Sequence, residues 1–110
     1  MGLHSCFTVL FFTVTVTECK KTKMGIEYSG RINVTNTGIP CQKWISQSPH
    51  GHPLDKLHDH RYPENSSTLA RNYCRNPDLE GWEGPWCYTV NPHVRWEYCH
   101  VKCCKGSNCI

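Results

Sequence analysis

The pattern of hydrophobic and polar positions after residue 17 shows no long amphipathic helix. Apolar residues come in short runs, which predict strands of a few residues, such as Ile26-Glu27-Tyr28 and Trp96-Glu97-Tyr98. Turn-forming pairs separate these runs, and seven prolines and eight glycines are spread evenly along the chain. We therefore expect irregular loops with a few short strands. Such a chain cannot build a broad hydrophobic core, so covalent cross-links must replace it.

The N-terminal segment has a different pattern. Residues 1–17 contain no Lys, Arg, Asp or Glu, and Phe7 to Val16 form an apolar run broken only by threonines. This is typical of the hydrophobic region of a secretory signal, with cleavage near Thr17, although alternating Val, Thr and Phe would also suit a strand. The run is too short to span a membrane. We predict a signal peptide over residues 1–17, whose removal also removes Cys6.

Nine cysteines in 110 residues indicate a disulfide scaffold and an oxidising compartment, so we expect a secreted or extracellular protein. The eight cysteines after residue 17 suit full pairing, but the sequence alone cannot choose the pairs. The absence of any Cys-x-x-Cys motif argues against a zinc protein. Histidines form two His-x-His pairs, His50 with His52 and His58 with His60, which could hold Zn or Cu. No cysteine or carboxylate set converges on them by sequence, so we predict no metal and no cofactor.

The net charge is +3, and basic residues are scattered apart from Lys20, Lys21 and Lys23. Without a basic stripe interleaved with aromatics, nucleic-acid binding has little support; the lysine cluster suits a solvated surface, with a heparin patch as the alternative.

Asn33 and Asn65 begin glycosylation sequons in turn-rich stretches. The serines lack the context of a protease nucleophile and the cysteines should be bridged, so we expect no enzyme.

More specific information lies in six runs that follow one another in a fixed order. They are Tyr28-x-Gly30, Thr37-x-x-x-Cys41-Gln42-x-Trp44, Pro49-His50-x-His52, Asn72-Tyr73-Cys74-Arg75-Asn76-Pro77-Asp78, Pro85-Trp86-Cys87-Tyr88-Thr89 and Arg95-Trp96-Glu97-Tyr98-Cys99. From Cys19 through Cys104 the chain resembles a kringle domain. The resemblance implies a small disulfide-rich fold, mostly irregular loops with short antiparallel β-strands, over residues 18–104, followed by a short tail over 105–110.

The resemblance also implies three disulfides, which would join Cys19 to Cys104, Cys41 to Cys87 and Cys74 to Cys99. Cys104 rather than Cys103 leaves the gap after Cys99 that kringles usually show. The surplus cysteines, Cys103 and Cys109, would pair with each other, or one would bind another chain. The chain departs from the family pattern by extra residues around 57–67 and by one extra residue near Gly81-Trp82-Glu83. Both departures are expected to affect local loop shape more than the fold.

Many kringles bind lysine side chains, and the resemblance transfers that site to specific positions here. Asp78 and Glu80 match the anionic positions that receive an ammonium group, and Arg95 matches a cationic position for a carboxylate. Trp86 and Trp96 match the walls of an apolar trough, with Tyr88 and Tyr98 in support. Leu54 replaces a second basic residue, and Lys56 lies two positions on.

The same residues also have a purely structural interpretation. Trp86, with Trp44 and Tyr73, would fill a small core; Asp78 would cap the turn at Asn76-Pro77; Arg95 would pair with Glu97 or Glu80. Trp44 and Tyr73 are expected to be structural in either case.

The sequence therefore predicts a secreted, non-enzymatic protein-interaction module that docks exposed or C-terminal lysines of an extracellular protein. The alternative is a fragment or short isoform of a larger kringle-bearing serine protease or receptor tyrosine kinase, in which the kringle targets or regulates.

Overall fold

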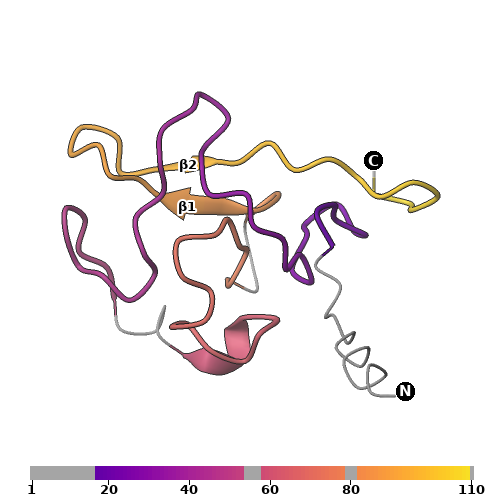
Figure 1. Cartoon of the computed structure of the whole chain (residues 1–110), viewed down its shortest axis with the longest axis horizontal. Coiled ribbons are helices and arrows are strands. Elements are labelled where there is room, and N and C mark those ends of the chain that lie inside the picture. Colours follow the sequence, from indigo (N-terminus) through magenta and orange to yellow (C-terminus); the bar gives the residue numbers. More distant parts are fainter. Residues whose placement is uncertain (1–16, 54–57, 79–81, 110) are drawn as a thin grey trace, which may run out of the picture.

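The computed structural model describes residues 17–53, 58–78 and 82–109, and most of these form turns and loops (Figure 1). Within these ranges the regular elements are one turn of 3-10 helix, η4 (Asp59–Arg61), and two strands, β1 (Trp86–Tyr88) and β2 (Trp96–Tyr98). The strands pair antiparallel, with Trp86 opposite Tyr98 and Tyr88 opposite Trp96. The expected loop-rich fold with short antiparallel strands is confirmed. Among the described residues, no helix is long and apolar enough to cross a membrane.

The two predicted strands have different outcomes. The strand at Trp96–Tyr98 is confirmed as β2, whereas the one at residues 26–28 is wrong, because that segment is a turn. Gly25 has φ 62° and its carbonyl accepts a hydrogen bond from the amide of Tyr28 at 3.0 Å, which bends the chain. A Cβ atom at Gly25 would lie 2.9 Å from the Pro85 side chain, so glycine suits both the conformation and the close approach.

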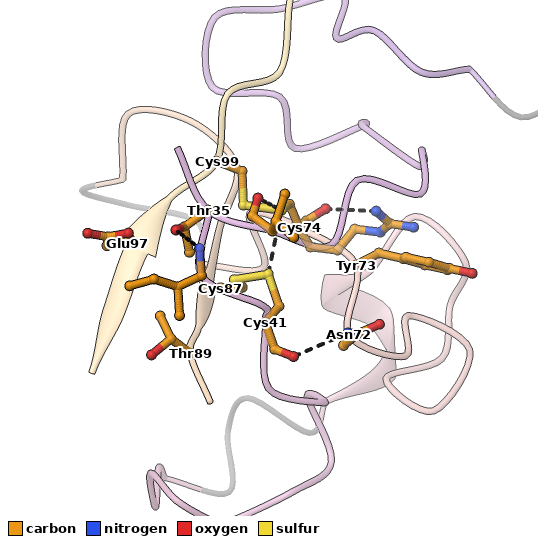
Figure 2. Close-up of a disulfide and its surroundings, with 12 residues drawn as sticks. Thr35, Cys41, Asn72, Tyr73, Cys74, Cys87, Thr89, Glu97 and Cys99 are labelled. Carbon is orange, nitrogen blue, oxygen red and sulfur yellow. Dashed lines mark hydrogen bonds between the residues drawn. A yellow bond between two sulfur atoms is a disulfide. The ribbon is translucent and has the colours of Figure 1, made fainter. Parts of the chain in front are cut away.

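Two disulfides packed against each other form the centre of the fold (Figure 2). They are Cys41–Cys87 and Cys74–Cys99, and the sulfur atoms of Cys41 and Cys74 lie 3.8 Å apart. The four sulfur atoms lie within 4.8 Å of one another and all four residues are buried. Because these sulfurs are bonded in pairs, they offer no thiolate ligand to a metal ion.

Two further disulfides act near the chain ends. Cys19–Cys104 joins residues 85 positions apart and encloses the two central bridges, which interleave in sequence; the three pairs that the resemblance implied are thus all formed. In the chain-entropy model a loop of this length is worth about 4.6 kcal/mol. Beside this bridge the amide of Cys104 donates to the carbonyl of Lys20 at 2.8 Å. Cys103 and Cys109 pair with each other, the internal alternative of the two expected for them.

A small aromatic core lies next to the disulfides. The indole of Trp44 is fully buried and contacts the rings of Trp86, Tyr62 and Tyr88 edge to face, with centroids 5.0, 5.6 and 6.0 Å away. Its Nε1 donates to the carbonyl of Tyr73 at 2.7 Å, so the one polar atom of this indole is satisfied. Trp44 is therefore a core residue.

The extra segment around residues 57–67 contributes to this interior. Glu64 accepts hydrogen bonds from Nε (3.0 Å) and Nη2 of Arg75, a side chain that is only 1% exposed. Arg75 Nη1 also donates to the carbonyls of Gly30 and Cys74 at 2.8 and 2.7 Å. The inserted segment thus supplies the counter-ion of a buried cation. The expectation about local loop shape did not include this contribution to the interior.

Candidate functional site

The strand pair brings together four aromatic residues of the predicted site. Alternate residues of a strand point to the same face, and Trp86 and Tyr88 of β1 lie opposite Tyr98 and Trp96 of β2. The rings of Trp86 and Trp96 lie 6.1 Å apart at 73°, and those of Trp96 and Tyr98 lie 5.1 Å apart at 86°. One face of the hairpin therefore carries a continuous aromatic surface.

A fifth ring, which sequence reasoning missed, covers part of this surface. Trp82 stacks on Trp86 with centroids 4.2 Å apart and an interplanar angle of 14°, and it meets Trp96 edge to face at 4.4 Å. Trp86 is consequently 0% exposed, whereas Trp96 remains 37% exposed. The two residues matched to the trough walls are thus both in contact with an indole of the same chain. The only sequence signal was a tryptophan at the place where the chain has one extra residue, just before Gly84-Pro85-Trp86.

Asp78, which matches an anionic position of the site, also contacts a side chain of the same protein. The Oδ1 atom of Asp78 lies 3.4 Å from Nη1 of Arg61, the last residue of η4, and the two side chains are only 12% and 22% exposed. Burial, with the negative charge of Asp78 in addition, raises the pKa of neighbouring Tyr62 well above its ordinary value. Of the other residues matched to charged positions, Glu80 lies outside the described residues, as do Leu54 and Lys56.

Arg95, which matches the cationic position of the site, is exposed. The guanidinium carbon of Arg95 lies 5.2 Å from the ring centroid of Tyr88, whose ring also stacks with His52 at 5.1 Å. Among the described residues Arg95 has no ion pair, and Glu97 instead accepts a hydrogen bond from Thr37 Oγ1 at 2.7 Å. Arg95 is therefore held by a cation–π contact and can still receive a carboxylate.

The packing around Trp82 and Asp78 leaves some polar atoms unsatisfied. Within the described ranges, three buried side-chain atoms lack a hydrogen-bond partner, namely Arg61 Nε, Asn76 Oδ1 and Trp86 Nε1. The amide nitrogen of Asn76 donates to the carbonyl of Trp82 at 3.4 Å, so all three residues adjoin Trp82 or Asp78. A buried polar atom without a partner costs about 1–3 kcal/mol. This region is accordingly less well satisfied than the disulfide core.

The first histidine pair has structural contacts. Nε2 of His50 lies 2.8 Å from the carbonyl of Asn91, and Nε2 of His52 lies 2.9 Å from the carbonyl of Ser46. The second pair, His58 and His60, is exposed, with rings 5.6 Å apart.

The sequon residues Asn33 and Asn65 are both exposed, so an oligosaccharide on either would point to solvent. Their glycosylation stays a prediction.

Comparison with known proteins agrees with this geometry. The family model of the kringle domain, a non-catalytic protein-interaction module typical of extracellular proteins, matches residues 19–104. The human apolipoprotein(a)-like protein 2 is 44% identical over 91 residues, which cover 83% of this chain and 63% of that protein. The chain thus spans less than two thirds of the length of this curated relative. Together with the four disulfides and the aromatic hairpin, the match over residues 19–104 shows that the chain belongs to the kringle family.

Proposed function

We propose that this chain is a secreted, non-enzymatic module that docks exposed or C-terminal lysine side chains of an extracellular protein. The observation that carries the proposal is the combination found beside the hairpin. Asp78, a nearly buried carboxylate, already holds a cationic side chain, and an aromatic cluster rich in indole lies on β1 and β2, where Trp86 bridges to Arg75, three residues before Asp78. A lysine side chain needs the same two components, an anion for its ammonium group and an apolar wall for its methylenes.

Each component has a definite role. Asp78 would accept the ammonium group in place of Arg61, and the indoles of Trp86 and Trp96 would contact the methylenes. A cation near these rings adds about 0.5–2 kcal/mol. Exposed Arg95 would bind the free carboxylate of a C-terminal lysine in a bidentate fork. Internal lysines, which have no such carboxylate, would use only the first two components.

Secretion is the other part of the proposal. Its support is the eight bridged cysteines, which persist in an oxidising compartment, and the exposed sequon asparagines. The proposed signal peptide over residues 1–17 lies almost entirely outside the described residues. Amino-terminal sequencing of the protein released by expressing cells tests it, and a mature chain that begins near Glu18 is expected.

Titration of the refolded chain with 6-aminohexanoic acid, followed by tryptophan fluorescence, tests lysine binding. A saturable change at millimolar ligand is expected, and Asp78→Asn should abolish it. Glu83→Gln is the matched control, since it removes one negative charge from an exposed side chain a few residues away. No response in the unmodified protein, or an equal response in the Asp78→Asn variant, would refute the assignment.

A further inference from the structure

We infer that two side chains of this protein, Trp82 and Arg61, occupy the lysine cleft as an internal competitor, so that a ligand must displace them. The inference rests on the proposed lysine-binding function and names how that site is regulated. Its basis is that the two components of a lysine ligand, an apolar body and a cation, are both already supplied from within the chain.

The apolar component is Trp82. Its ring lies parallel to the ring of Trp86 at 4.2 Å and edge-on to Trp96 at 4.4 Å, so it contacts both residues proposed as the walls. Trp86 has no exposed surface in this arrangement. The methylenes of a lysine cannot lie on the indole face of Trp86 while Trp82 covers it.

The cationic component is Arg61. Its guanidinium Nη1 lies 3.4 Å from Asp78 Oδ1, in the position proposed for the ligand's ammonium group. The pair is mostly shielded from water, with side-chain exposures of 22% and 12%, so it is screened less than a surface ion pair. An incoming ammonium therefore competes with a resident cation for Asp78.

Both competitors lie at the two places where the chain is longer than the family pattern. Arg61 belongs to the segment around 57–67, and Trp82 lies at the single extra residue near 81–83. The remaining predicted site residues that the structure describes lie at positions that match the family pattern. The departures from that pattern thus converge on one place in the fold, although they are about twenty residues apart in sequence.

The fit of the internal competitor is imperfect, which is what makes displacement feasible. Arg61 Nε and Trp86 Nε1 are buried without a hydrogen-bond partner among the described residues. Moving Trp82 and Arg61 out of the cleft would return these groups to water or to the ligand. The apparent dissociation constant then equals the intrinsic constant divided by the fraction of molecules with an open cleft.

The test compares the full chain with Trp82→Ala, Trp82→Phe and Arg61→Gln by calorimetric titration with 6-aminohexanoic acid. Trp82→Ala should bind about tenfold more tightly than the unmodified protein, equivalent to about 1.4 kcal/mol. Trp82→Phe keeps a ring against Trp86 and should stay close to the unmodified protein. Arg61→Gln removes the guanidinium that contacts Asp78 and should also tighten binding. Leu69→Ala, a truncation of a side chain that is 57% exposed and lies outside the cleft, is the control and should change nothing.

The possible outcomes separate this inference from the proposed function. Equal affinity in all variants would refute internal competition and leave lysine binding intact. Weaker binding in Trp82→Ala would also refute it, since Trp82 would then be a wall of the site. No binding in any variant would refute lysine binding, and the inference with it. Mass spectrometry of unreduced peptides identifies a variant that has not formed its disulfides, and Arg61→Gln then provides the test independently of Trp82.

Discussion

The buried pair between Arg75 and Glu64 gives the sharpest test of how this fold is stabilised. We consider the substitution Glu64→Gln, which keeps the shape of the side chain and removes its charge. Arg75 would then remain buried at 1% exposure without a counter-ion. Because a guanidinium does not lose its proton at ordinary pH, the cost cannot be avoided by neutralisation.

The magnitude follows from the contacts that remain. Removing one partner of a buried ion pair costs about 3–5 kcal/mol. The cost should fall somewhat below that range here, since Glu64 is 18% exposed and the guanidinium keeps two backbone carbonyls and lies 5.4 Å from the ring centroids of Tyr28 and Tyr73. We expect the free energy of unfolding to decrease by about 2–4 kcal/mol, a large fraction of the total for a small domain.

Equilibrium denaturation in guanidinium chloride, with the disulfides intact, measures this change. The denaturation midpoint should fall while the denaturant dependence of the free energy stays the same. Glu83→Gln makes the same chemical change at an exposed position and should stay within about 0.5 kcal/mol of the unmodified protein. A double-mutant cycle with Arg75→Met isolates the pairwise energy. A loss below about 1 kcal/mol for Glu64→Gln, or no coupling in the cycle, would contradict the reasoning that the inserted segment stabilises the interior.

Three further predictions concern the tail, the acid range and the ligand. Replacing both Cys103 and Cys109 by serine opens the loop that their disulfide closes, whose ends are 6 positions apart in sequence. The free energy of unfolding should fall by about 2 kcal/mol. The affinity of the same samples for 6-aminohexanoic acid should not change. Hydrogen bonds from Thr35 and Thr37 lower the pKa of Glu97 in the folded protein. These bonds therefore stabilise the fold fully above pH 4.5, the pKa of this side chain in the unfolded chain, and their contribution is lost as the pH falls below that value. Thr37→Val should therefore flatten the decline of stability below that pH, and an unchanged slope in acid denaturation would count against this. Arg95→Gln should weaken the binding of 6-aminohexanoic acid by about fivefold, roughly 1 kcal/mol. The affinity for pentylamine, which has no carboxylate, should not change. An equal loss of affinity for both ligands would refute the proposed role of Arg95 as the carboxylate-binding residue.

The strand and core positions within the family motifs could be predicted from the sequence, because these motifs place residues at fixed positions relative to the cysteines. Trp96 and Tyr98 flank Glu97 in a short alternating run, and that run is β2. Trp44 was expected in the core, and it lies there. In contrast, residues 26–28 have strand-forming composition but follow Gly25, whose positive φ turns the chain. Local composition was outweighed there by a backbone conformation that the sequence suggests only weakly.

The extra segments could not be assigned from the sequence because their contacts follow no period. Glu64 contacts Arg75 eleven positions away, and Arg61 contacts Asp78 seventeen positions away. Trp82 stacks on Trp86, only four positions later in the chain. Each contact depends on where a loop returns to the disulfide core, which is decided by packing rather than by propensity. The side chains that cover the predicted cleft were therefore visible only in the structure.

The 3.8 Å approach between the sulfur atoms of Cys41 and Cys74 has a consequence for anyone handling this protein. If mild reductant opens one of the two central bridges, the freed thiolate is positioned to attack the other bridge, and the partners can reshuffle by exchange. A lone Cys87→Ser substitution should thus give a mixture of scrambled isomers, whereas losing Cys41 and Cys87 together should leave one homogeneous species. Cysteine substitutions at the centre of this molecule should therefore replace both partners of a disulfide together.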